Sequence, residues 1–162
     1  MNILVLGVVF EISRPISSLA SQSVIAQKKA YEALLERIVA ERKIQLIGEG
    51  DLEGQPTIAK ALSERLKVRH IYLEMSPMER VFAGIEEDQQ SRKGNVPVKT
   101  DAERRAHVVA EVLDEAKGAT SILVIVGCPH LDAIVDLLTR AGHRAERHDI
   151  KKHSDIWKDL PP

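Results

Sequence analysis

The sequence predicts an α/β protein, a three-layer sandwich in which a mostly parallel, Rossmann-like sheet carries helices on both faces. Two observations support this prediction. Apolar runs with the length of strands alternate along the chain with segments whose apolar residues recur every three or four positions, as in amphipathic helices. The strand-like runs are also continuously apolar, which is typical of strands covered on both sides. With 162 residues, the chain is long enough to bury such a core in one domain.

Four strong strands and one weaker strand are expected. The strong strands cover residues 3–9, 44–48, 70–74 and 122–127, and the weaker strand covers residues 144–150. The first run has no basic residues before it and is too short to cross a bilayer, so it predicts a strand and not a signal sequence or a membrane span. We expect a single domain over residues 1–150 and a tail over residues 151–162.

Four helices should connect these strands, over residues 23–42, 56–66, 101–117 and 131–140. Pro56 suits the first turn of the second helix, and Gly142 suits the end of the fourth. Thr100 or Asp101 is expected as the N-cap of the third helix. The polar stretch over residues 86–100 contains glycine and proline and predicts a surface loop.

The composition excludes several classes of function. The 23 basic and 24 acidic residues nearly cancel, so no overall field favours a nucleic-acid polymer or an anionic membrane. Aromatic residues make up only 3 %, which leaves no stacking platform for single-stranded nucleic acid. The single cysteine suits a reducing compartment, so we expect a cytoplasmic protein with Cys128 as a small buried residue. Phosphate-loop, dinucleotide-binding, H-E-x-x-H and C-x-x-C motifs are absent from the sequence.

Acidic residues and one histidine follow the predicted strands. Glu11 follows the first strand, Glu49 and Asp51 follow the second, Glu74 ends the third, and His130 follows the fourth. Because the carboxyl ends of parallel strands meet at one edge of a sheet, we expect these side chains to converge there. Such a set could hold a divalent metal ion through Glu49 and His130. It could instead provide a general acid and a general base for a hydrolytic water.

Each of these residues also has a structural explanation, and the sequence leaves both explanations open. Glu49 and Asp51 could cap the helix that starts near Pro56, since acidic residues are favoured at helix N-termini. Glu74 could pair with Arg80, and His130 could cap the last helix. Any one of these roles would remove its residue from the proposed site.

Several short motifs occur in a fixed order along nearly the whole chain. They are Gly7-Val8-Val9-Phe10-Glu11, Glu49, Thr57-Ile58-Ala59, Glu74, Glu79-Arg80 with Gly84-Ile85, Arg104-Arg105, and Gly127-Cys128-Pro129-His130 with Leu137-Leu138 and Gly142. On these motifs the chain resembles small bacterial α/β proteins that are distantly similar to the TraB/ChaN/erythromycin-esterase-like superfamily. The resemblance implies a metal-dependent hydrolase, or a binder of a haem-like ligand, built around G-x-x-H and acidic residues. Phe10 stands where that pattern has its first histidine, and it can neither ligate a metal nor carry a proton.

Two functions from different classes follow from these observations. The first is a hydrolase, with or without a metal ion, in which His130, Glu49 and Glu74 are catalytic. Arg80 and Arg105 would orient an anionic or carbonyl-bearing small molecule, and Glu11 is a further binding residue. The second is a non-catalytic Rossmann-like module that binds a nucleotide-type signal or a protein partner, with a homodimer as one form. An interaction through the tail around Trp157 is a third interpretation.

Overall fold

Five parallel strands form one sheet in the order β3-β2-β4-β1-β5. The structure is a computed structural model, and it describes residues 1–51, 53–83, 98–153 and 156, with the backbone alone at residues 10 and 98–101. The strands are β1 (Asn2–Val8), β2 (Leu46–Glu49), β3 (Arg69–Tyr72), β4 (Ser121–Gly127) and β5 (Arg144–Asp149). Every neighbouring pair runs parallel, so the predicted α/β fold with a Rossmann-like sheet is confirmed.

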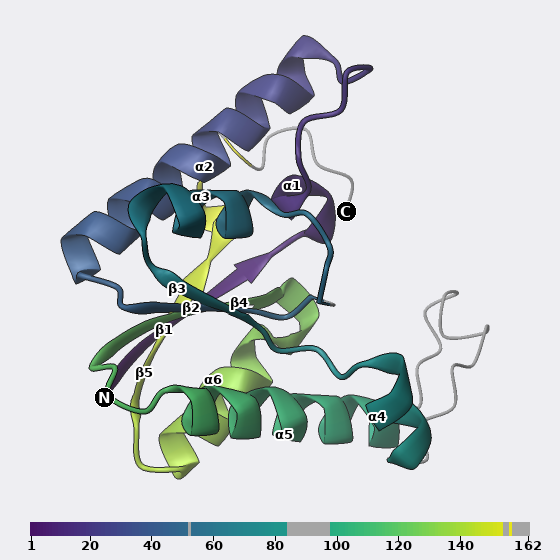
Figure 1. Ribbon diagram of the computed structural model, residues 1–162, viewed down its shortest axis with the longest axis vertical. Helices are drawn as coiled ribbons and strands as arrows, with labels where there is room; N and C mark the ends of the chain where they lie inside the picture. Colours follow the sequence, from purple (N-terminus) through teal and green to yellow (C-terminus); the bar gives the residue numbers. More distant parts are fainter. Residues whose placement is uncertain (52, 84–97, 154–155, 157–162) are drawn as a thin grey trace.

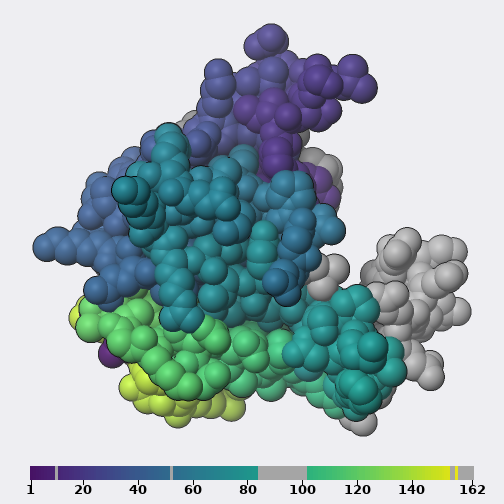
Figure 2. Space-filling view, viewed as in Figure 1, coloured from purple at the N-terminus to yellow at the C-terminus, as the bar shows by residue number. Residues whose placement is uncertain are grey.

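The helices form a layer on each face of this sheet. On one face lie α1 (Phe10–Ser13), α2 (Gln22–Arg42) and α3 (Ile58–Leu66), and on the other lie α4 (Pro77–Phe82), α5 (Val98–Glu115) and α6 (Leu131–Arg140) (Figure 1). Figure 2 shows the same division on the surface, with the purple-to-blue segments of α1 and α2 above and the green of α5 below. Each face has its own apolar core, because alternate side chains of β1 and β4 point to opposite layers.

The predicted elements agree with the structure except near α1, α3, α4 and α5. Helix α3 begins at Ile58 with Thr57 as its N-cap, so the prediction that Pro56 lies in its first turn was wrong. The third predicted helix, α5, begins at Val98, so the prediction of Thr100 or Asp101 as its N-cap was wrong. No helix breaker stands between Pro97 and Asp101 in the sequence, and the helix therefore extends back by one turn. The predicted loop over residues 86–100 thus ends in this helix, and its residues 86–97 lie outside the described residues.

The short helices α1 and α4 were not predicted, although the sequence carries the start signal of α4. Ser76 Oγ accepts a hydrogen bond from the Glu79 backbone N–H at 3.2 Å, and Glu79 Oε2 accepts one from the Ser76 N–H at 2.7 Å. This is a capping box, and Pro77 occupies the first turn, where its missing N–H costs nothing. The helix turns the chain away from β3 and leads it towards the layer of α5.

The connections that leave β2 and β4 run in opposite directions. The chain after β2 passes through α3 to the outer strand β3, whereas the chain after β4 passes through α6 on the other face and crosses β1 to reach β5. Connections that diverge in this way open a crevice at the carboxyl ends of the two strands, where ligands of open α/β sheets bind. At this point the Gly50 N–H donates to the Ile125 carbonyl at 2.7 Å, which holds the two strand ends together.

The described part of the predicted tail packs on the domain. A 3-10 turn over Ile150–Lys152 follows β5, and Ile150 and Ile156 are both buried in the core on the α2 face. Trp157, around which an interaction of the tail was expected, lies outside the described residues. Among the helices in the described part of the chain, none has the length and apolar character to cross a membrane.

Candidate functional site

A small cleft lies at the carboxyl ends of β2 and β4, on the face covered by α5 and α6. Its polar lining is Glu74, Arg104, Arg105 and His130, its apolar wall comes from α5, β4 and α6, and Gly50 and Gly127 also line it. It encloses about 350 Å³ of empty space, including the part open to solvent. We call this group of residues the cleft. Its position is the crevice that the diverging connections predict.

Glu74 holds an arginine pair in the cleft. Arg104 binds it in two places, with Nε donating to Oε1 at 3.1 Å and Nη2 donating to Oε2 at 2.5 Å. Arg80 Nη2 lies 3.3 Å from Glu74 Oε1, as the structural explanation of Glu74 expected. Bidentate pairs of this kind fix both groups in one geometry. The carboxylate of Glu74 is therefore paired with positive charge and positions Arg104.

The imidazole of His130 receives a hydrogen bond from Arg105. Arg105 Nε donates to His130 Nδ1 at 3.1 Å. A guanidinium nitrogen is always a donor, so Nδ1 must be the unprotonated nitrogen and Nε2 must carry the proton. In a Ser-His-Asp triad the reverse holds, because a carboxylate accepts from Nδ1–H and leaves Nε2 to take a proton. His130 is also the N-cap residue of α6, but its side chain makes no capping hydrogen bond.

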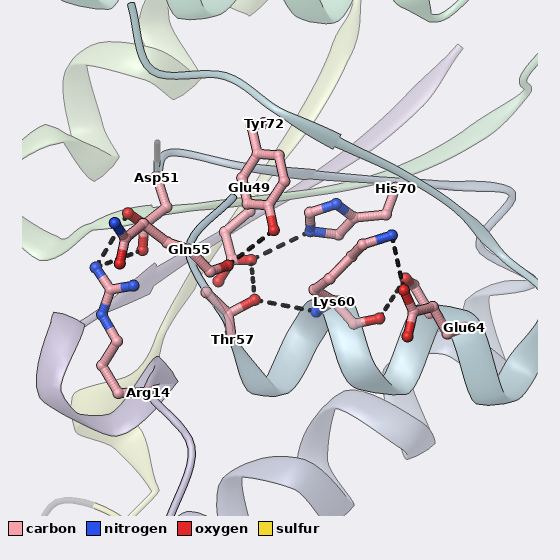
Figure 3. Close-up of polar contacts among 10 residues, drawn as sticks. Arg14, Glu49, Asp51, Gln55, Thr57, Lys60, Glu64, His70 and Tyr72 are labelled. Carbon is pink, nitrogen blue, oxygen red and sulfur yellow. Dashed lines mark hydrogen bonds and ion pairs between the residues drawn. The ribbon is translucent and has the colours of Figure 1, made fainter. Parts of the chain in front are cut away.

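A second polar group, the Glu49 cluster, lies on the opposite face of the sheet. It consists of Glu49, Thr57 and His70 (Figure 3). Thr57 Oγ1 donates to Glu49 Oε2 at 2.6 Å, and His70 Nε2 lies 3.2 Å from the same oxygen. The side chains of His70 and Glu49 are only 1 % and 2 % exposed. Thr57 Oγ1 also accepts from the Lys60 N–H at 3.1 Å, so the cluster joins β2 and β3 to the start of α3.

An ion pair lies beside the Glu49 cluster. Arg14 Nη2 lies 3.0 Å from Asp51 Oδ1 and 2.9 Å from Oδ2, and it connects the segment after α1 to the end of β2. Lys28 of α2 donates to the carbonyls of Arg14 and Pro15 at 2.7 and 3.0 Å. Burial, and then the charge of Arg14, lower the pKa of Lys28. These contacts attach α1 and α2 to the same edge of the sheet.

The Glu49 cluster also affects a buried phenol on α2. Tyr31 is fully buried, and burial together with the negative charge of Glu49 raises its pKa well above the usual value for tyrosine. The phenol therefore stays protonated in the folded protein. A buried carboxylate, imidazole and phenol lie on this face, whereas the cleft on the other face is rich in arginine.

The structure brings together some of the predicted site residues and separates others. Glu74, Arg105 and His130 line the cleft, and Arg80 pairs with Glu74 at its side. Glu49 does not line the cleft, because its hydrogen bonds are with Thr57 and His70 on the other face. Glu11 lies exposed on α1. The expected convergence therefore holds for His130 and Glu74 but does not include Glu49 or Glu11.

Strand alternation explains why Glu49 and the cleft separate. Successive residues of a strand point to opposite faces, so Glu49 at the end of β2 points to α3 while the next residue, Gly50, lines the cleft. A Cβ atom on Gly50 would lie 3.3 Å from the Ile125 carbonyl oxygen, so the close approach of β2 and β4 favours glycine there. Position after a strand predicts the edge of the sheet but not the face.

Sequence analysis did not select His70 and Arg104 as site residues. His70 lies inside β3 opposite Ile47 and not at a strand end, so a search of the residues after strands passes over it. Its signal would have been a polar residue at a buried position of a short strand. Arg104 was noted only as part of an arginine pair on a helix. The sequence could not show which of the two adjacent arginines reaches Glu74.

The cleft does not fit a divalent metal ion. Arg80, Arg104 and Arg105 place three positive charges around Glu74 and His130, and His130 Nδ1 already accepts from Arg105. A cation would be repelled by these guanidinium groups. In the described ranges, no three or more His, Cys, Asp or Glu side chains gather as a metal site would require. Shared metal binding by Glu49 and His130 stays a prediction, and the two residues belong to separate polar groups.

Comparison of the chain with family models, with curated proteins and with solved structures finds no match. The class of protein therefore follows from its fold and its polar groups. It is an α/β protein with a parallel Rossmann-like sheet, and it has an arginine-lined cleft where the connections of β2 and β4 diverge.

Proposed function

We propose that the protein is a binding module that takes a small molecule bearing a carboxylate or phosphate group in the cleft. The observation that carries this proposal is the hydrogen bond from Arg105 Nε to His130 Nδ1 at 3.1 Å. It makes the imidazole a hydrogen-bond donor through Nε2–H instead of a proton acceptor. An imidazole that donates from Nε2–H beside an arginine is suited to bind an anion. It cannot act as a general base through that nitrogen.

The charge of the cleft supports the same proposal. Within the described residues, Arg80 and Arg104 pair with the carboxylate of Glu74, and Arg105 lines the same cleft. Arginine recognises carboxylates and phosphates through its planar fork of donors. Nε and Nη2 of Arg104 already donate to Glu74, so Arg104 supports a bound anion through its positive charge at a fixed position. Val108, Val126 and Ile134 provide an apolar wall against which the uncharged part of a ligand would pack.

Hydrolysis is a second candidate function, because Glu74 and His130 line the same cleft. In the tautomer that Arg105 imposes, His130 is a neutral imidazole that can offer a hydrogen bond from Nε2–H but can neither accept a proton there nor act as a general acid. A general base would have to come from Glu74, whose carboxylate is paired with Arg104 and Arg80. Turnover would therefore need both pairs to rearrange, whereas binding needs neither change.

Anion titrations test the proposal directly. Inorganic phosphate, acetate, citrate and adenosine monophosphate are titrated at constant ionic strength, with chemical shifts and the melting temperature as readouts. We expect saturable binding of at least one anion, with stabilisation of about 2.7 kcal/mol at a hundred times Kd. Arg105→Met should weaken this binding about tenfold or more, because a bidentate charged contact is lost.

The control for this titration is Arg37→Met. It removes an exposed arginine on α2, which covers the opposite face of the sheet from the cleft. It should leave the affinity unchanged. Failure of every anion to saturate, or equal binding by Arg105→Met and the native protein, would contradict the proposal. Hydrolysis of ester or phosphoester substrates that is abolished by His130→Ala in a folded protein would instead support the second candidate.

A further inference from the structure

Two histidines near the C-terminal end of the sheet face each other. His148 belongs to β5, and His153 follows the 3-10 turn over Ile150–Lys152. Their Nε2 atoms lie 2.7 Å apart, and their rings are nearly parallel, with an interplanar angle of 21° and centroids separated by 5.0 Å. We call them the histidine pair. The pair shares no residue with the cleft or the Glu49 cluster.

The chain reversal that creates the histidine pair is held by several contacts. The Asp149 side chain accepts a hydrogen bond from the Lys151 N–H at 3.0 Å, and the His153 N–H donates to the Ile150 carbonyl at 2.9 Å. Ile150 and Ile156 are 0 % and 1 % exposed and anchor the turn on both sides of His153. The two imidazoles are therefore brought together by the fold and do not meet by chance movement of a loose tail.

We propose that the histidine pair binds a divalent transition-metal ion such as Zn²⁺, Ni²⁺ or Cu²⁺ through both Nε2 atoms. Neutral imidazole nitrogen is the ligand that these ions most commonly use in proteins. In the present geometry one Nε2–H donates to the other Nε2, so the two nitrogens point at each other. Two ligands at about 2.05 Å in tetrahedral geometry lie about 3.3 Å apart, so the Nε2 atoms need to separate by about 0.6 Å and the rings need to turn until both lone pairs aim at one ion beside the line that joins them.

The proton balance of this step is simple. In the neutral pair one histidine carries its proton on Nε2 and the other on Nδ1. When the metal ion binds, the first histidine keeps a proton by carrying it on Nδ1, and both Nε2 lone pairs are donated to the ion. No net proton is released from the neutral pair. The remaining coordination positions are filled by water or by a small ligand, since no third His, Cys, Asp or Glu joins the pair within the described residues.

The charges around the pair set the expected selectivity. Glu146 lies two residues before His148 on the same face of β5, and it is held by Arg42 through hydrogen bonds of 3.0 and 2.8 Å. Among the described residues the pair thus provides nitrogen ligands, while the carboxylate of Glu146 is engaged by Arg42. Magnesium and calcium prefer oxygen ligands, so they should not bind at this position.

The experiment is a titration of the full chain with NiCl₂ and with ZnCl₂ at neutral pH, followed by calorimetry and by the NMR signals of the histidine rings. We expect one site, with the ring signals of His148 and His153 shifting together and with no response to MgCl₂. His148→Gln and His153→Gln should each weaken binding about tenfold or more. His143→Gln, a change to a partly buried histidine just before β5, should leave the affinity unchanged.

Other outcomes overturn the proposal. These are the absence of saturable binding, shifts confined to other histidines, or retained affinity in a folded His153→Gln protein. His148 lies within a strand, so its substitution could reduce stability. His153→Gln and the ring signals of the native protein then decide the result without the His148 variant. Because the cleft shares no residue with the pair, anion titrations of the same samples report on the proposed function separately.

Discussion

The cleft and the Glu49 cluster lie at the same edge of the same sheet, but on opposite faces. The side chains of Glu49 and His70 are almost completely buried, whereas those of Arg80 beside the cleft and Arg104 in it are 17 % and 29 % exposed. Each group contains a carboxylate and an imidazole. In the Glu49 cluster they contact each other directly, and in the cleft an arginine contacts each of them. Residue types alone therefore do not reveal which group can meet a ligand.

The difference lies in what each contact stabilises. The Glu49 cluster joins β2, β3 and α3 out of contact with water, so its hydrogen bonds contribute mainly to folding. The contacts in the cleft hold positive charge at a position that solvent reaches. Substitutions in the first group should therefore change stability, and substitutions in the second should change ligand binding. Three predictions test this division, beginning with the largest expected effect.

Glu49→Ala should lower the free energy of unfolding by about 3–5 kcal/mol. The change leaves the donors of Thr57 and His70 buried without their acceptor, which is costly for each of them. Urea denaturation followed by circular dichroism measures the effect. Glu36→Ala removes a partly exposed carboxylate that pairs with Arg65, and it should cost less than about 1 kcal/mol. A loss below about 1 kcal/mol for Glu49→Ala would contradict a structural role.

The sequence predicts the sheet and its edge because burial patterns and strand ends are local. Continuous apolar runs identify β1 and β4, and parallel pairing brings their carboxyl ends together. The face on which a side chain lies depends on the exact strand end, because a shift of one residue reverses it. The observed β3 ends at Tyr72, two residues before the predicted end, and this sets where Glu74 points. The partners of Glu74 and His130 come from α5, whose approach no local pattern encodes.

Glu74→Gln should strengthen anion binding in the cleft about threefold to tenfold. The substitution removes a negative charge that is paired with Arg80 and Arg104, so a bound anion meets a more positive site. The measurement is the anion titration proposed above, at low and at high salt, and the gain should shrink as salt screens the charges. If Glu74 were instead an acid or base in hydrolysis, the same variant would lose turnover. Unchanged or weaker anion binding by Glu74→Gln would contradict the prediction that the charge of Glu74 opposes anion binding.

The reactivity of the Cys128 thiol shows whether the cleft also contains a reactive thiol. Of the three predictions, this one has the smallest expected effect. Cys128 follows Gly127 of the cleft in sequence, yet it is partly buried and packs on the core of the opposite face. Burial, and then the charge of Asp149, raise the pKa of this thiol. The thiolate is the reactive form, so iodoacetamide should modify Cys128 more slowly in the folded protein than in urea.

The sign of the pH dependence follows from the raised pKa of Cys128. Folding favours the protonated thiol, so its contribution to stability is present below the pKa of the unfolded thiol and is lost as the pH rises through the pKa of the folded one. The rate of alkylation in the folded protein should rise over the same alkaline range. Anion binding measured near neutral pH should be the same in the native protein and in the Cys128→Ala variant, because the sulfur packs on the other face. Fast modification at neutral pH that is slowed by a bound anion would instead place the thiol in the cleft.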